Sequence, residues 1–569
     1  MTGADLARLS RTVLHLRPGQ VAHRARLQAQ QAGLRQFPEA GHRLLSGPSP
    51  SAVVGWPDTF RPVDASTPGQ WPGLSDLRSS KIRLLGLVRE LGDPPGWQHA
   101  DAPRLWRFHL HYWDWAWGLA ADPDRLAARA VFARLWRSWR TSVPFGLGDA
   151  WHPYPAALRA WSWCGLYRDL VAGSDIEAEF VAGLADNAGF LRRHLEYDVG
   201  GNHLIKGLKG LAGLAVFFAD EQLLRLAVRR LSRQLARQVL ADGGHFERAP
   251  AYHCQVLADL IDMADLLLAT GRAPADELST ATDRMRSWLG AVLTPDGQVP
   301  LLNDGYPVGA ELLTALRPGP IPDGSLFVLP ATGLVRAVAG DWHLLADVGP
   351  PCPSSLPAHA HADTFGCLLH VGQDPLLIDT GTSTYEPGAA RRHERSTAAH
   401  STVQVDGADS TEVWGVFRAG RRARVSDINA RADSSGITCE AVHDGFRSLR
   451  GRPLHRRRWS LTSSGLRVDD TVTGQGRHEI VIRWQLAVGS AIRVAKTHAI
   501  VTAPAGTFSV AVVATDPVLL AAETSQIAAG FGNTIDAPVL SCRAHAALPI
   551  RVTTIWSRAR GSMGGKGST

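Results

Sequence analysis

Cysteine is scarce in this 569-residue chain, and long apolar runs are missing from it. The six cysteines lie far apart and form no Cys-x-x-Cys pair, which argues against both a disulfide framework and a zinc site built from thiolates. No run of about 18 apolar residues occurs, so we expect no integral membrane span. A composition of 45% hydrophobic and 20% charged residues is typical of a globular protein.

Blocks of one charge are also missing. The net charge of +7 comes from arginines scattered along the chain, and no Lys/Arg run coincides with a motif that reads nucleic acid. We therefore expect no nucleic-acid partner. The positive balance gives slight support to an anionic substrate.

The N-terminus lacks the apolar core of a secretory signal, which points to a cytoplasmic location, with an unusual export route as the alternative. Its arginines could form the basic face of an amphipathic helix at a membrane surface. The commoner interpretation is a solvated helix face. The arginines concerned are Arg8, Arg11, Arg17, Arg24 and Arg26.

A chain of this length exceeds one core, so we expect two large domains. From about Pro103 to Leu316 apolar residues recur at helical spacing, with short polar or glycine links. The predicted helices are 124–140, 154–170, 176–195, 204–218, 221–240, 255–268 and 275–293. Helices in series without strands predict a bundle, a solenoid or a toroid, and the period alone does not choose among them.

After Pro330 the pattern changes to short segments, mostly rich in β-branched residues and separated by turn-forming or polar residues. The predicted strands are 334–338, 342–348, 367–371, 376–378, 402–405, 423–425, 466–468, 480–485, 500–502 and 508–513. This pattern is typical of an antiparallel sandwich. The segment Arg317–Gly324, rich in Pro and Gly, separates the two regions.

Ten of the 18 tryptophans lie between Trp97 and Trp163. We expect about half of them to pack between helices. The others, beside His111, Tyr112, Tyr154 and Arg159, would suit the floor of a sugar cleft, because flat apolar sugar faces stack on indole rings.

Two polar segments interrupt the helical region. Asn202-His203 opens a predicted helix, and a helix N-cap is the simpler interpretation of Asn there. The segment Gly243–His253 includes Glu247, Arg248 and Tyr252, with Pro250 suited to a first helical turn. A solvated helix start is the simpler interpretation of that segment.

The stretch from His359 to His400 carries the densest chemistry. It reads His359-Ala-His361-Ala-Asp363, then Asp379-Thr-Gly, then Arg395-Ser-Thr-Ala-Ala-His400. Imidazole and carboxylate are the ligands that zinc takes where thiolate is absent, and a His-x-His pair on a strand points both rings to one face. These residues predict either a metal site or an acid–base site.

Taken in order, these motifs resemble the heparinase II/III family of polysaccharide lyases over roughly residues 100–500, with Trp414 and Phe417-Arg418 adding to the match. The resemblance implies an α+β multidomain fold: an incomplete α/α toroid of helical hairpins, then an antiparallel β-sandwich, with the active site between them. The implied domains are a 1–95 extension that packs on the toroid, the toroid at 96–320, the sandwich at 325–560 and a flexible tail at 561–569.

The family's reaction is β-elimination at a uronic acid, which leaves a 4,5-unsaturated uronate. Removing the C5 proton places charge on the carboxylate, so a donor must disperse it, a base must reach C5 and an acid must protonate the leaving oxygen. By resemblance Asn202 is the carboxylate neutraliser, Tyr252 the acid and often the base, and His359 a base or polariser. The predicted substrate-binding residues are Tyr112, Arg159, His203, Glu247, Arg248, Arg395 and Trp414.

By the same resemblance His361, Asp379 and His400 match the ligands of a structural zinc, and no organic cofactor is implied. The alternatives are hydrogen-bonded histidines within a sandwich and an Asp379 that begins a turn. Ser401 stands where the family commonly has Asn, a change that could loosen the shell around the last ligand. Arg395 could pair with a substrate carboxylate or with Asp363.

Three hypotheses follow. The first is a lyase that cleaves an acidic, uronate-containing polysaccharide. The second is a protein of the same fold that binds an acidic glycan without cleaving it, or that serves polysaccharide synthesis. The third is a zinc-dependent hydrolase, which would need an open coordination position. The sequence predicts no oligomeric state.

Overall fold

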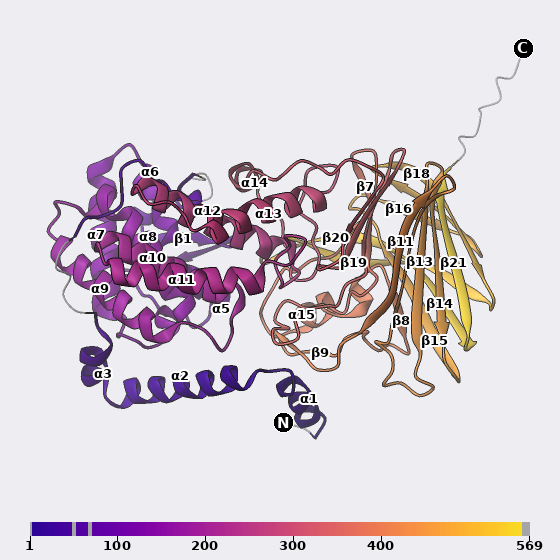
Figure 1. The fold of residues 1–569 in the computed structure, drawn as a ribbon, viewed down its shortest axis with the longest axis horizontal. Helices are drawn as coiled ribbons and strands as arrows, with labels where there is room; N and C mark the ends of the chain where they lie inside the picture. The colour runs from indigo at the N-terminus through magenta and orange to yellow at the C-terminus, as the bar shows by residue number, and fades with distance from the viewer. Residues whose placement is uncertain (1–2, 48–52, 67–70, 560–569) are drawn as a thin grey trace, which may run out of the picture.

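The computed structural model describes residues 3–47, 53–66 and 71–559. Helices fill one end of the molecule and antiparallel sheets fill the other (Figure 1). The predicted fold class, a helical toroid followed by a β-sandwich, is confirmed. The predicted tail at 561–569 lies outside the described residues. Within them, no helix is long and apolar enough to cross a membrane.

The toroid contains all seven helices that the apolar period predicts. Its helices are α4 (Leu74–Arg78), α5 (Arg104–Leu110), α6 (Trp117–Ala121), α7 (Arg125–Ser142), α8 (Pro153–Leu166), α9 (Glu177–His194), α10 (Gly201–Phe217), α11 (Glu221–Gln238), α12 (Pro250–Ala269), α13 (Asp276–Val292) and α14 (Ala310–Leu316). α10 is buried on nearly every side and packs against α8, α11 and α12. α11 keeps one polar face in solvent, as expected of an outer helix.

The β-domain is built from three antiparallel sheets. The first is β11 (Val425–Asp433), β12 (Gly436–His443), β13 (Leu454–Thr462), β14 (Gly465–Thr473), β21 (Ile550–Arg558), β18 (Gly506–Ala514), β17 (His498–Ala503) and β16 (Ala491–Val494), in that spatial order. The second is β19 (Val518–Gly530), β20 (Asn533–Ala547), β15 (Arg477–Gln485) and β8 (Val403–Val405). The third is β3 (Leu326–Leu329), β4 (Leu334–Ala339), β5 (Trp342–Asp347), β6 (Cys367–Val371) and β7 (Asp374–Leu377).

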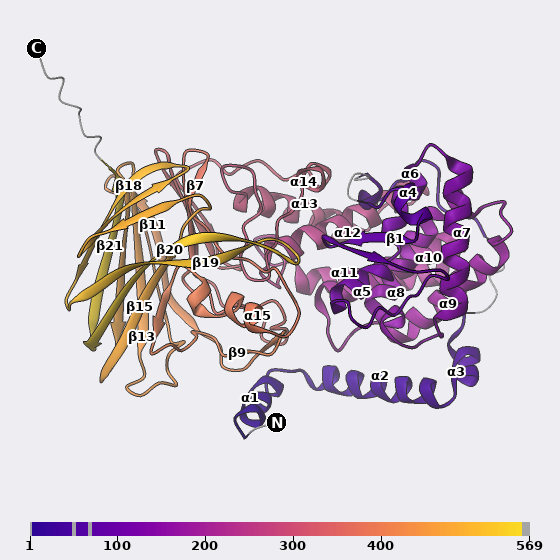
Figure 2. The same cartoon turned by 180° about the vertical axis from the view of Figure 1, so that it is seen from behind.

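The chain before the toroid forms an N-terminal arm, residues 3–47, and a small hairpin. The arm consists of α1 (Gly3–Val13), α2 (Pro18–Gln36) and α3 (Pro38–Leu45), and the hairpin of β1 (Lys81–Leu84) and β2 (Leu87–Glu90). Seen from the front and from behind, the arm lies along one edge of the molecule, with α1 beside the β-domain and α3 beside the toroid (Figures 1 and 2).

Three short elements complete the β-domain and bring loops toward the toroid. They are α15 (Ala389–Glu394) and the paired strands β9 (Val413–Trp414) and β10 (Arg418–Ala419). β8 pairs with β15 through Val405 and Ile480, and this register holds the segment that ends in His400 and Ser401 against the second sheet.

Candidate active site

The site begins at the first turn of α10. Gly200 and Gly201 have φ values of 74° and 55°, and a Cβ on Gly201 would lie 1.8 Å from Oε1 of Glu247. This left-handed turn lets Glu247 approach closely. The backbone N–H of Asn202 donates to Oε1 of Glu247 at 2.9 Å, and its side-chain Nδ2 donates to Oε2 at 2.9 Å. Asn202 and Glu247 therefore form one buried unit.

The ring of His359 lies between two carboxylates. Its Nδ1 donates to Oδ2 of Asp304 at 2.9 Å, and its Nε2 lies 3.5 Å from Oε2 of Glu247. Burial alone would raise the pKa of Glu247, but the neighbouring imidazole groups of His359 and His245 and the hydrogen bonds from Asn202 outweigh burial and lower that pKa. Glu247 is therefore ionised at neutral pH.

Tyr252, in the first turn of α12, stacks on His359. Their ring centroids are 3.8 Å apart with the planes 30° from parallel. The Tyr252 and Tyr385 hydroxyls share a 2.7 Å hydrogen bond across the seam between the two domains. Burial, and after it the neighbouring tyrosines, raise the pKa of Tyr252 well above its ordinary value. The hydroxyl is therefore protonated at neutral pH and can act as a proton donor.

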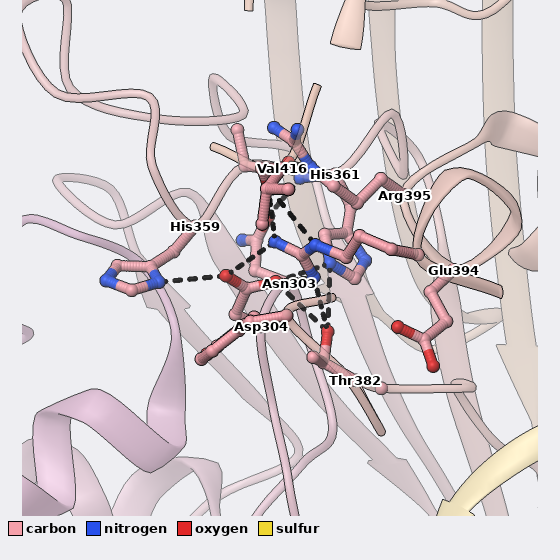
Figure 3. Close-up of polar contacts among 12 residues, drawn as sticks. Asn303, Asp304, His359, His361, Thr382, Glu394, Arg395 and Val416 are labelled. Atoms are coloured by element: carbon pink, nitrogen blue, oxygen red, sulfur yellow. Dashed lines mark hydrogen bonds and ion pairs between the residues drawn. The ribbon is translucent and has the colours of Figure 1, made fainter. Parts of the chain in front are cut away.

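Asp304 is the residue that the sequence analysis missed at the centre of the site. It lies in the loop between α13 and α14, and it accepts hydrogen bonds from His359, from Nε2 of His361 at 2.9 Å and from Thr382 at 3.0 Å (Figure 3). Arg391 of α15 forms a two-pronged ion pair with it, at 2.5 and 3.0 Å. Burial would raise the pKa of Asp304, but Arg391 and the two histidines hold it well below its ordinary value.

The three predicted zinc ligands lie near one another, with the rings of His361 and His400 5.3 Å apart, but they bond to carboxylates and do not converge on one point. Nδ1 of His400 donates to both oxygens of Asp379, at 3.0 and 3.1 Å, whereas Nε2 of His361 is bonded to Asp304. Among the described residues there is no group of three or more His, Cys, Asp or Glu side chains that could hold a metal ion. The zinc prediction is therefore not supported, because two predicted donors bond to each other and the third bonds elsewhere.

His203 and Tyr112 lie on the toroid side of this cluster. Nδ1 of His203 donates to Glu196 at 3.0 Å, and its ring lies 4.3 Å from the ring of Tyr154, which lies 5.9 Å from that of Tyr112. Burial would lower the pKa of His203, but Glu196 outweighs burial and raises it. His203 is thus a candidate cation near the buried Glu247.

The predicted sugar cleft lined by tryptophans and Arg159 is not found, because these side chains are buried. All ten tryptophans from Trp97 to Trp163 are at most 4% exposed, so none offers a stacking surface. Arg159 is fully buried, its guanidinium lying over the rings of Trp139, Trp151 and Trp163 and bonded to Asn187. Together they form the toroid core.

Three other predicted substrate-binding residues bond to parts of the protein itself. Arg248 has a left-handed φ of 61° and donates to the carbonyl of Thr332. Arg395 is buried and donates to the carbonyls of Ala360 and Arg418, so it joins loops and does not pair with Asp363. Nε1 of Trp414 donates to Thr12 of the arm at 3.0 Å. The structure does not bring these three to the Tyr252–His359 pair.

Sequence comparisons match both halves of the chain. The profile described as "Heparinase II/III N-terminus" matches residues 97–317, and the one described as "Heparinase II/III-like, C-terminal" matches residues 321–552. A curated relative, "FtsZ-localized protein C" of Caulobacter vibrioides, is 30% identical over 435 residues, which are 73% of this chain and 72% of the relative.

Solved structures agree on the fold. A heparinase III structure has a TM-score of 0.74 at 15% identity and covers 93% of this chain and 92% of its own. A chondroitin AC lyase of Streptomyces coelicolor, solved with chondroitin sulphate, has a TM-score of 0.54 at 12% identity. The match covers 94% of this chain and 83% of the lyase chain. At these identities the likeness shows the architecture alone.

Proposed function

Since the chain belongs to the heparinase II/III-like family, we propose that it is a polysaccharide lyase that cleaves a uronate-containing glycan by β-elimination. The observation that carries the proposal is the stacked Tyr252–His359 pair, in which a protonated hydroxyl lies against an imidazole oriented by Asp304. An acid and a base side by side are what an elimination across C4 and C5 needs.

In this mechanism His359 removes the C5 proton at Nε2. Asp304 holds the other ring nitrogen and stabilises the imidazolium as it forms. The C5–H electrons form the C4–C5 double bond, the C4–O bond breaks, and the leaving oxygen takes the proton of Tyr252. The proton on His359 then passes to the tyrosinate through solvent, which restores both groups. Asn202 and His203 disperse the charge on the substrate carboxylate.

The test is a rise in ultraviolet absorbance from the conjugated, unsaturated uronate product. The purified chain is mixed with heparin, heparan sulfate, alginate and hyaluronan, and with acidic polysaccharides made by the source organism. The proposal expects a rise with at least one acidic polymer and none with a neutral glucan. An acidic polymer that binds tightly without any rise would overturn it.

A non-cleaving protein that binds acidic glycans, or that serves polysaccharide synthesis, is the second candidate. It is favoured by the bonds of Asn202, whose side-chain nitrogen is directed at both oxygens of Glu247 and not at open space. The curated relative is also named for a location and not for a reaction. Binding without an absorbance change is the result that this candidate predicts.

A further inference from the structure

The N-terminal arm is fixed to both domains and is not a loose tail. Near its start Arg11 pairs with Glu412 of the β-domain. In its middle, Nε2 of His23 bonds to the carbonyl of Leu195 at 2.7 Å. At its end His42 lies 3.1 Å from Asp186 of α9. These contacts occupy one side of the arm and leave the other side in solvent.

The exposed side carries large apolar residues at helical spacing. Leu6, Val13 and Leu14 are 56%, 45% and 83% exposed, and their i, i+7, i+8 spacing places them along one side of α1 and its end. Phe37 and Leu44 are 63% and 70% exposed and are seven residues apart across α3. Apolar groups therefore lie in solvent at both ends of the arm, on a chain segment bonded to both domains.

The arm is also strongly basic. Residues 3–47 contain seven arginines against two carboxylates, Asp5 and Glu39. No ion pair is found for Arg17 or Arg35 in the described part of the chain, whereas other arginines of the arm bind Glu412 or Asp198. The arm therefore exposes apolar side chains and an excess of positive charge on the same segment. A partner that fits it must accept the apolar groups and also supply negative charge.

We propose that the N-terminal arm docks the protein onto an anionic lipid membrane. Lipid headgroups neutralise the arginines while the acyl boundary accepts Leu14, Phe37 and Leu44. An anionic glycan would satisfy only the arginines and leave the apolar groups in water. A second copy of the chain would place two basic arms against each other. The helices lie on the membrane and do not cross it, since α1 and α3 are amphipathic and short and no described helix is long and apolar enough to span a bilayer.

The experiment is co-sedimentation of the full chain with vesicles of mixed phosphatidylglycerol and phosphatidylcholine, with pure phosphatidylcholine vesicles in parallel. The arm docks to the anionic vesicles and much less to the neutral ones, and high salt weakens the binding. The double variant Leu14→Glu, Leu44→Glu reduces binding by about tenfold or more. The matched control, Val513→Glu with Leu519→Glu, replaces residues 63% and 66% exposed on the β-domain and leaves binding unchanged.

A second variant, Arg17→Gln with Arg35→Gln, removes charge without breaking an ion pair found in the structure. It lowers vesicle binding at low salt and leaves the melting temperature unchanged. The proposal is overturned if anionic vesicles do not bind the chain, if the control pair loses as much binding as the arm pair, or if soluble heparin binds the arm and anionic vesicles do not displace it.

Discussion

At the scale of single residues, the hydroxyl of Tyr252 is the group whose removal separates chemistry from structure. Tyr252→Phe keeps the ring stacked on His359 but removes the proton donor and its bond to Tyr385. We expect turnover to fall by about 10²–10⁴-fold while the melting temperature changes little. Initial rates of ultraviolet absorbance measure this. Tyr167→Phe, which removes a hydroxyl bonded to Glu177 far from the site, is the control and should keep full activity.

Asp304 has a double role, and one substitution should expose both. Asp304→Asn leaves the Arg391 charge buried without its partner, which is expected to cost about 3–5 kcal/mol of unfolding free energy. It also removes the carboxylate that orients His359, so kcat should fall with little change in KM. Thermal unfolding and steady-state kinetics measure the two effects. Full activity in a destabilised Asp304→Asn protein would show that Asp304 is structural only.

The His203–Glu196 pair predicts a pH dependence of stability. The pKa of His203 is raised above 6.5, so its contribution is complete below pH 6.5 and is lost as the pH rises through the raised value. The pKa of Glu196 is lowered below 4.5, so its contribution is lost as the pH falls through that lowered value. Both groups are charged only between the lowered pKa of Glu196 and the raised pKa of His203. In that pH range His203→Gln should lower the free energy of unfolding most, by about 1–3 kcal/mol. Melting curves across pH check this, and a pH-independent difference would contradict it.

The sequence motifs predicted the residues that gather at the Tyr252–His359 pair better than the residue that orients them. Asn202, Glu247, Tyr252 and His359 meet in space, as their motifs implied. Asp304 was missed because its partners lie 55 or more residues away and its own neighbours, Asn303 and Gly305, look like a turn. The signal that could have found it is a polar Asn-Asp-Gly-Tyr segment in a linker between apolar helices.

At the scale of elements, helices were easier to predict than strands. The seven predicted helices are amphipathic or wholly apolar over three turns or more, which gives a clear period. β13 was missed because two of its inward positions are His455 and Arg457, both fully buried, so the strand lacks the apolar alternation that marks a buried face. Such polar inward residues are recognisable only once their partners are known, here Asp470 on the neighbouring strand β14 and the loop carbonyls of Phe365 and Ser401.

Arg457 of β13 provides the element-scale prediction. It binds Asp470 through two nitrogens, and its Nη1 donates to the carbonyls of Phe365 at 2.9 Å and Ser401 at 2.6 Å. It thus holds the loops that follow His359 and His400. Lysine at position 457 cannot make all four bonds. We therefore expect Arg457→Lys to lower the free energy of unfolding by about 2–4 kcal/mol and to lower the rate of turnover. Urea unfolding measures the change in stability, and initial rates of ultraviolet absorbance measure the change in turnover. The control is Arg456→Lys on the exposed face of the same strand, which should change the free energy of unfolding by no more than about 0.5 kcal/mol.

At the scale of the whole molecule, the proposed catalytic groups come from both domains. Asn202, Glu247 and Tyr252 belong to the toroid, whereas His359 and Tyr385 belong to the β-domain. Tyr252 and His359 are each only 8% exposed, so little of either side chain faces solvent. Sequence period could predict each domain separately, but it carries no information on how their surfaces meet, which depends on side-chain contacts between distant segments.

The N-terminal arm also joins the toroid to the β-domain. Its attachment to each domain can be tested separately. Arg11 and Thr12 join α1 to Glu412 and Trp414, whereas α3 has its own contacts with the toroid through His42 and Leu45. The double variant Arg11→Ala, Thr12→Ala should therefore free α1 alone. We expect backbone amide exchange in residues 3–16 to quicken by about tenfold or more, with exchange in α3 unchanged, because local opening follows local contacts. Mass spectrometry of deuterium uptake measures this, with Arg43→Ala, whose ion pair with Glu39 lies within α3, as the control. Equal acceleration in α1 and α3 would mean that the arm opens as one unit, and the two attachments would then not be independent.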